Sequence, residues 1–417
     1  MSIGYACHAM AVPGSGIKKC LLRNADTHRL QELIGANLDA LDRMVAYNIA
    51  NGIMLYRISS DIVPFASSPV NDLPWESRFQ ERLTNIGRKI KESGMRVSMH
   101  PGQYTVLNSP DERTVENAVS ELQYHARFLD SLGVDGQHKI VLHVGGVYGD
   151  KREAVRRFLT RLDRMEEAVR RRLVIENDDR SYCVSDVLDI SAQAGIPVVF
   201  DNLHHAANPP PEAAPEVEWI NRCGQTWKPR DGRQKIHYAQ QEPGKKAGAH
   251  SLSIRADEFL AFHGRLGPQA PDIMLEVKDK NISARKCSLL TDADTRIGEL
   301  EREWARCKYL VLERSQAAYL AIRGLLKDKS AYPALTFYRL IEQGLSSAPD
   351  AGSAENAANH VWGYFKDLAE PAERARYARA LEGFKEGETS IQTLKRILYT
   401  LAQRYQQDYL LESYYFC

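Results

Sequence analysis

Short apolar runs recur along the chain, and longer segments with helical periodicity separate them. Each run is rich in Val, Ile and Leu and lacks the alternation of apolar and polar positions that marks a half-buried strand. Such runs are typical of parallel strands that helices cover on both faces. Eight of them lie at 3–7, 53–58, 95–99, 139–143, 173–176, 197–201, 235–238 and 272–276.

The segments between the runs predict helices at 26–50, 75–92, 112–131, 150–172, 185–194 and 257–266. Eight strand-helix repeats over roughly 300 residues indicate the α/β class, with the strands closed as a (β/α)8 TIM barrel. An open doubly wound sheet is the alternative. We rank it second because no GxGxxG string follows the first run, and for the same reason we expect no nucleotide cofactor.

The carboxy-terminal part of the chain follows a different pattern. After Asp294 the periodicity is helical only, and the string SSAPDAGS at 346–353 is typical of a flexible linker. We therefore predict a TIM-barrel domain at 1–330, a linker region at 331–353 and a small all-α domain at 354–417. The apolar and aromatic spacing of that last segment indicates ordinary core packing.

Composition and charge narrow the class of protein. The chain has 417 residues, of which 43% are hydrophobic and 26% charged, so it is able to bury a full core. It has no apolar run of membrane-spanning length and no secretory signal pattern, which predicts a cytoplasmic protein without a membrane partner. Its seven cysteines form no CxxC pair, so we expect reduced thiols. The net charge of +1 excludes a global basic footprint, and an anionic partner must bind locally.

The strand ends carry the candidate chemistry. In a TIM barrel the carboxyl ends of the strands and the loops after them build the active site. Imidazole and carboxylate together suit divalent zinc, manganese or iron. Because one ion cannot take so many ligands, the set predicts two or three ions, an arrangement suited to hydrolysis of a phosphodiester. The side chains at these strand ends are His100, His143, Glu176, Asp201, His204, His237, His250 and Glu276.

Several strings at these positions together resemble the UV damage endonuclease family. The resemblance covers about residues 1 to 290, and its most specific strings follow in the family's order. The family is similar to endonuclease IV in fold, and the resemblance implies a TIM barrel with up to three divalent metal ions that nicks DNA immediately 5′ of UV photoproducts. The strings are MHPGQY at 99–104, LHVGG at 142–146, IEND at 175–178, FDNLHH at 200–205, KIHY at 235–238 and LEVKDK at 275–280.

The resemblance also implies roles for individual residues. All eight strand-end side chains become metal ligands, with Mn²⁺ as the first choice of ion and Zn²⁺ as the second. Lys235 becomes a carboxylated lysine that bridges metals, and we assign Glu176, His143 and Lys235 to catalysis. Gln103 and Tyr104 match a pair inserted into the duplex at the lesion, and Tyr5 matches another lesion-side residue. The last segment of the chain resembles a helical domain of unknown function found beside DNA repair proteins.

One departure from the family pattern concerns the metal centre. The string FASSP at 65–69 places Ser68 where the family has a histidine ligand, and serine is a poor ligand for a transition metal. The substitution puts one of the three metal sites in question.

The expected partner is damaged double-stranded DNA, and we expect the protein to bind it as a monomer. Recognition would depend on how easily the bases unstack at the damaged step, so abasic sites are expected as further substrates. Phosphate contacts are expected from basic groups near the barrel mouth, namely Arg57, Lys228, Arg230, Arg233 and Lys278. Two alternatives stay open: a metal-dependent sugar isomerase on the same barrel, and a protein that binds lesions without cutting them.

Overall fold

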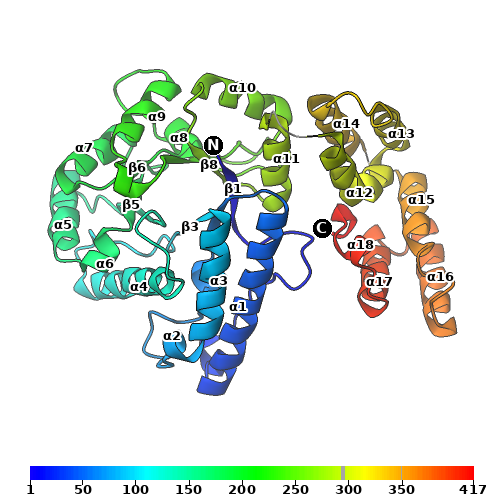
Figure 1. The fold of residues 1–417 in the computed structure, drawn as a ribbon, viewed down its shortest axis with the longest axis horizontal. Coiled ribbons are helices and arrows are strands. Elements are labelled where there is room, and N and C mark those ends of the chain that lie inside the picture. Colours follow the sequence, from blue (N-terminus) through cyan, green and yellow to red (C-terminus); the bar gives the residue numbers. More distant parts are fainter. Residues whose placement is uncertain (293–295, 349) are drawn as a thin grey trace. The chain divides into compact units, whose positions relative to one another are not determined.

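The computed structural model describes residues 1–292, 296–348 and 350–417. Eight parallel strands form one sheet in the order β6-β5-β4-β3-β2-β1-β8-β7, which confirms the predicted α/β barrel (Figure 1). Each of the eight apolar runs contains one strand. The strands are β1 Ile3–Cys7, β2 Leu55–Ile58, β3 Arg96–Met99, β4 Ile140–His143, β5 Leu173–Glu176, β6 Val198–Val199, β7 Lys235–Tyr238 and β8 Asp272–Leu275.

The sheet closes at a narrow seam between its two end strands, β6 and β7. A single parallel bridge joins Asp201, just beyond β6, to His237 of β7. The His237 amide donates a hydrogen bond to the Phe200 carbonyl over 2.9 Å. Two of the predicted metal ligands therefore sit on the segment that closes the barrel.

Helices follow the strands, as the alternation predicts. Aspartates at the N-caps of several helices accept hydrogen bonds from the first turn, as Asp111 does from the Thr114 amide. Gly94 and Gly195 end their helices in the left-handed conformation, at φ 71° and 66°. The helices are α1 Thr27–Ala50, α2 Trp75–Arg78, α3 Gln80–Ser93, α4 Glu112–Ser131, α5 Lys151–Asp163, α6 Glu167–Arg170, α7 Val184–Ala194, α8 Asn202–Ala207, α9 Glu216–Gln225, α10 Ala256–Leu266 and α11 Asn281–Thr291.

The close approach of β1 to β2 depends on a glycine. A Cβ atom on Gly4 would lie 1.9 Å from the Leu55 carbonyl oxygen, so no other residue fits there without a shift of the backbone.

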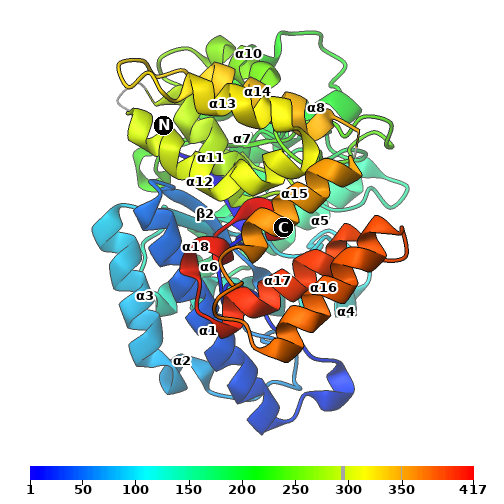
Figure 2. The same cartoon turned by 90° about the vertical axis from the view of Figure 1, so that its right-hand side faces the viewer.

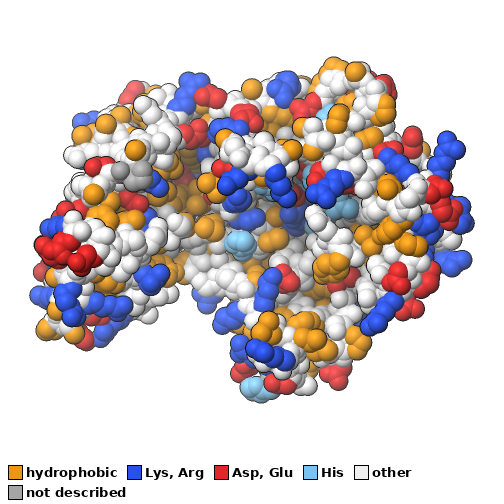
Figure 3. Space-filling model, turned by 180° about the vertical axis from the view of Figure 1, so that it is seen from behind, with side chains coloured by type: hydrophobic (Ala, Val, Ile, Leu, Met, Phe, Trp, Pro, Cys, Tyr) orange, Lys and Arg blue, Asp and Glu red, His pale blue; other side chains and the backbone are white. Residues whose placement is uncertain are grey.

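Acidic and basic side chains are interspersed towards the edges of the face in Figure 3, whereas Lys, Arg and His side chains gather near its middle. No helix among the described residues is long and apolar enough to cross a membrane.

The chain divides into two compact units, and the division falls inside α10 and α11. The first unit comprises Met1–Ala9, Gly14–Ile254 and Ala261–Arg285, and the second comprises Met10–Pro13, Arg255–Leu260 and Lys286–Cys417. Figure 2 turns the helices of the second unit towards the viewer. They are α12 Ile297–Arg314, α13 Gln316–Leu325, α14 Ala334–Ser346, α15 Ala351–Trp362, α16 Pro371–Lys385, α17 Ile391–Arg404 and α18 Asp408–Leu411.

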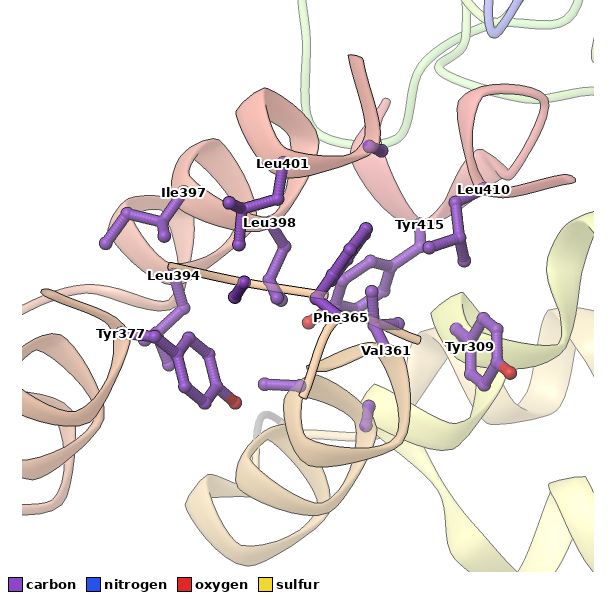
Figure 4. Close-up of a cluster of buried hydrophobic side chains, with 14 of the residues drawn as sticks. Tyr309, Val361, Phe365, Tyr377, Leu394, Ile397, Leu398, Leu401, Leu410 and Tyr415 are labelled. Carbon is purple, nitrogen blue, oxygen red and sulfur yellow. The ribbon is translucent and has the colours of Figure 1, made fainter. Parts of the chain in front are cut away.

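The second unit is larger than the predicted all-α domain at 354–417. The predicted linker region at 331–353 contains α14, and α12 packs against both α14 and α15. Its hydrophobic cluster joins residues from α12, α15 and α17, including Tyr309, Val361 and Leu398, with Phe365 from the turn after α15 (Figure 4). Asp294, the predicted start of the helical region, and residue 349 of the linker lie outside the described residues.

Candidate metal centre

Glu176, the last residue of β5, lies at the centre of a cluster of imidazoles. Its Oε2 atom is 3.1 Å from His100 Nε2 and 3.7 Å from His143 Nε2. Its Oε1 atom is 2.7 Å from His237 Nδ1 and 3.7 Å from His204 Nδ1. The two carboxylate oxygens therefore face two different pairs of histidines, and the carboxylate is almost completely buried.

Glu276, which follows β8, extends the cluster. Its Oε1 atom is 3.3 Å from His237 Nδ1, and its Oε2 atom is 3.7 Å from His250 Nε2. The guanidinium of Arg57 in β2 donates to the same Oε1 atom over 2.5 Å. His237 thus stands between two buried carboxylates, and Arg57 holds the second of them in place.

Two sets of side chains offer ligand atoms that lie within 4.8 Å of one another. One set is His100, His143 and Glu176, and the other is Glu176, Asp201, His237 and Glu276. Glu176 belongs to both sets, which is the position of a carboxylate that bridges two metal ions. Mixed nitrogen and oxygen donors of this kind fit zinc, manganese or iron.

Two side chains of the cluster each have one buried polar atom that must be accounted for. His237 Nε2 and Asp201 Oδ2 are buried and make no hydrogen bond to any residue that the structure describes. Leaving such an atom without a partner is costly, typically by about 1–3 kcal/mol, so a buried polar atom of this kind calls for an explanation. A divalent cation would satisfy the Asp201 oxygen, whereas His237 faces Glu176 and Glu276 with its Nδ1 atom and not with Nε2.

The acid-base properties of the cluster reflect its burial and its excess of carboxylates. Burial lowers the pKa of His100 to about 4 and raises the pKa of the Asp201 carboxyl. Burial alone would also lower the pKa of His204, but Asp201, Glu176 and Glu276 raise it to about 9. The protonated, positively charged form of His204 is therefore favoured by the carboxylates around it.

Lys235 is the first residue of β7 and lies on the same side of the strand as His237, two residues further on. Its side chain is buried. Burial, together with the nearby charges of Arg96 and Arg57, lowers the pKa of Lys235 well below its usual range. The amine is thus favoured in its neutral, nucleophilic form.

Two asparagines that were not predicted from the sequence fix the ligand backbone. The Asn177 side chain donates to the Asp201 carbonyl over 3.0 Å and accepts from the Asp201 amide over 2.9 Å. The Asn177 carbonyl also lies 2.9 Å from His204 Nδ1. Asn202 makes the same pair of bonds to Ala239, beyond β7. The only sequence signal for these two residues is that each directly follows a ligand.

A second set of polar contacts holds the backbone of His100. The Ser60 hydroxyl donates to the His100 carbonyl over 2.8 Å, and His125 Nε2 lies 2.9 Å from that hydroxyl. His125 is buried in α4, where its Nδ1 atom is 2.6 Å from the Glu121 carbonyl oxygen. This chain of contacts fixes the backbone at the start of the loop after β3.

That loop carries the predicted lesion-binding pair, and the structure leaves both side chains exposed. Tyr104 is 71% exposed. Tyr104 and Ser68 border the same cavity of about 320 Å³, together with Glu121. Tyr5 is different: it lies within β1, is fully buried, and donates a hydrogen bond to Asn48 Oδ1 over 2.9 Å. The structure does not bring Tyr5 to a surface that DNA can reach.

The predicted phosphate contacts separate into three groups. Lys278 follows β8 and is exposed on the same side of the barrel as the cluster. Arg57 lies inside the cluster, paired with Glu276. Lys228, Arg230 and Arg233 precede β7 and so lie at the opposite, amino-terminal end of the barrel. The structure does not bring these three residues to the metal centre.

Comparisons with known proteins agree with this geometry. The family described as UV-endonuclease UvdE matches residues 3–297, and a protein family of unknown function, DUF1722, matches residues 308–417. A UV DNA damage endonuclease of Clostridium perfringens is 39% identical over 354 residues, which cover 84% of each chain. One from Bacillus cereus strain Q1 is 33% identical over 68% of this chain and 92% of its own. The crystal structure of SacUVDE matches with 39% identity and a TM-score of 0.65, covering 69% of this chain and 96% of that one.

We expect the two hydrogen bonds between the Asn177 side chain and the Asp201 backbone to control metal affinity. Replacing Asn177 with Ala frees the Asp201 backbone and should weaken Mn²⁺ binding about tenfold, because residues that orient metal ligands typically have effects of this size. Calorimetric titration of the metal-free protein with Mn²⁺ measures the affinity. Asn117→Ala, at an exposed position of α4, serves as the control. Equal affinity in the Asn177 variant and the wild type would contradict the assigned role.

Proposed function

The chain belongs to the UV-endonuclease UvdE family, and from this premise we propose that it nicks duplex DNA immediately 5′ of UV photoproducts. The proposed substrates are cyclobutane dimers, 6-4 photoproducts and abasic sites. The observation that carries the proposal is the position of Glu176, a buried carboxylate whose two oxygens face separate groups of histidines. This arrangement suits a two-metal or three-metal phosphodiester hydrolase.

We propose that two or three divalent ions, Mn²⁺ first and Zn²⁺ second, bind to the strand-end cluster. When bound, such ions polarise the phosphodiester and lower the pKa of a coordinated water. The residues that would hold them are His100, His143, Glu176, Asp201, His204, Lys235, His237, His250 and Glu276. Glu176 would bridge the two groups, and His143, at the end of β4, would complete the first.

Lys235 enters this scheme as a carboxylated lysine. Its neutral amine would attack carbon dioxide, forming a nitrogen–carbon bond and releasing one proton, so that the product is a carbamate anion. Burial and the low pKa of the amine support this modification, since only the neutral amine is nucleophilic. The carbamate oxygens would add another oxygen ligand to a centre that already favours positive charge.

The surface around the centre supports a role for the loop after β3 in recognising the lesion. Gln103 and Tyr104 are exposed three and four residues beyond His100. An amide and an aromatic ring can fill the space left by extruded bases and stack on their neighbours. Lys278, two residues beyond Glu276, is exposed. We assign it to the DNA backbone.

The alternatives predicted from the sequence differ in their support. The curated relatives at 39% and 33% identity are endonucleases, which favours nicking over sugar isomerisation. The lesion-binding alternative rests on Ser68 alone, and the two ligand sets found in the structure do not include residue 68. Two groups of candidate ligands therefore come together without a contribution from residue 68.

We expect the Glu176→Gln variant to lose nicking by about a thousandfold or more, because removing the shared charge disrupts both groups of ligands. The assay uses Mn²⁺ and a duplex with one thymine photodimer, and a denaturing gel maps the cut. Glu116→Gln, at an exposed site of α4, is the control and should cut like the wild type, immediately 5′ of the dimer. Wild-type nicking by Glu176→Gln would refute the bridging role.

The Tyr104→Ala variant should narrow the difference in affinity between damaged and intact duplex by about tenfold, because one stacking interaction is lost. Tyr104→Phe retains the ring and should keep that difference. The measurement is the ratio of the two dissociation constants, determined without metal so that neither duplex is cut. If Tyr104→Ala and the wild type show the same ratio, Tyr104 does not probe the lesion.

A further inference from the structure

Four tyrosines from four segments gather on the carboxy-terminal unit. Tyr309 lies in α12, Tyr319 in α13 and Tyr409 in α18, and Tyr364 follows α15. The rings of Tyr364 and Tyr409 stack with centroids 5.9 Å apart and planes 23° from parallel, and each residue is 37% exposed. The Tyr309 and Tyr364 hydroxyls lie 3.0 Å apart. Tyr309 lies at the edge of the buried cluster in Figure 4, so the group is anchored to the core of the unit.

Two cations lie over these rings without a counter-ion. Lys308 Nζ is 4.7 Å from the ring centre of Tyr309 and 5.1 Å from that of Tyr409. The Arg323 guanidinium lies 5.7 Å from the ring centre of Tyr319. Neither cation forms an ion pair with a carboxylate in the described part of the chain.

The positive charges of Lys308 and Arg323 are not neutralised by an ion pair within the described residues. Burial and the neighbouring charge of Arg323 together lower the pKa of Lys308. Several other cations of the unit face a carboxylate instead, as in the pairs Arg339–Asp257, Lys385–Glu355, Lys395–Glu313 and Arg404–Glu370. An anion bound beside Lys308 and Arg323 would relieve this repulsion.

The ligand that fits must have both a flat face and a negative charge. Half-exposed aromatic rings favour stacking, and unpaired cations favour phosphate, whereas a free phosphate ion would leave the rings unused. Unpaired nucleotides combine the two features, and proteins that bind single strands use stacking rings beside basic side chains. Double-stranded DNA keeps its bases stacked on one another and offers them no such contact.

We propose that Lys308, Arg323, Tyr364 and Tyr409 form a binding site for unpaired nucleotides of a nucleic-acid strand. A base extends the stack that Tyr364 and Tyr409 begin, and the flanking phosphates contact Lys308 and Arg323. The site lies wholly within the unit that matches the family of unknown function, so it does not rest on the proposed nicking activity. DNA and RNA strands share the chemistry that this site recognises.

The test measures binding of the full chain to fluorescein-labelled oligo-dT and oligo-U of about 15 nucleotides. Fluorescence anisotropy is recorded in EDTA, so that no strand is cut. Tyr409→Leu should weaken binding about tenfold, and Tyr409→Phe should restore it because the ring returns. The double variant Lys308→Met/Arg323→Met should weaken binding and also flatten its dependence on salt concentration.

Matched controls separate this site from general effects. Tyr399→Leu removes a ring that packs on Phe416 elsewhere in the unit, and Arg379→Met removes an exposed charge from α16. Both should bind like the wild type. Preference for oligo-dT would assign a DNA strand to the site, and preference for oligo-U would assign an RNA strand. Binding of neither strand by the wild type would overturn the proposal.

A second measurement uses the unaltered chain, so its outcome does not depend on the folding of any variant. Irradiation of the complex with a strand that contains 5-iodouracil attaches the strand to the aromatic rings that stack on it. Mass spectrometry should find the attached peptides to contain Tyr364 or Tyr409. Attachment confined to residues 1–285, or wild-type affinity in a folded Tyr409→Leu variant, would overturn the proposal. Nicking of damaged duplex is measured separately and tests only the function of the barrel.

Discussion

The structure depends on the burial of three carboxylates, Glu176, Asp201 and Glu276, within one cluster at the carboxyl end of the barrel. Like charges held this close in a medium of low dielectric repel one another strongly, and their burial is tolerated only with cationic partners. Imidazoles and Arg57 supply part of that compensation. The remainder is what divalent ions would supply, and Asp201 Oδ2 is a buried atom without a hydrogen-bond partner among the described residues.

The same cluster is tied to the closure of the fold. Asp201 and His237 form the bridge that joins the two end strands of the sheet. Asn177 clamps the Asp201 backbone, and Asn202 clamps the Ala239 backbone beyond β7. The candidate ligands and the closure of the barrel therefore share the same residues, and a change that loosens the seam would also displace the candidate ligands. The centre is held by strands and by buried amides, which is the kind of support that a precise metal site needs.

The sequence predicted the strands, which follow from hydrophobic periodicity. It did not predict the features that depend on which end of a strand, or which face of it, a side chain occupies. Apolar runs identify the strands, and in a parallel barrel every strand end points to the same face, so the candidate ligands could be named before their distances were known. Lys228, Arg230 and Arg233 were predicted to lie near the barrel mouth, but a residue just before a strand lies at the opposite end of the barrel from one just after it. Tyr5 was assigned by resemblance, but alternation within β1 turns its side chain outward to Asn48. The role of Asn177 was not predicted, because a side-chain amide that hydrogen-bonds to the backbone leaves no periodic pattern in the sequence.

The most direct test of the account is electron paramagnetic resonance of the full chain loaded with Mn²⁺, combined with metal analysis of the same sample. If Glu176 bridges two ions, the protein will hold at least two equivalents of Mn²⁺, and their spectrum will show spin coupling between neighbouring ions. One equivalent of Mn²⁺ with the spectrum of an isolated ion would contradict the bridging role of Glu176 and with it the proposed mechanism.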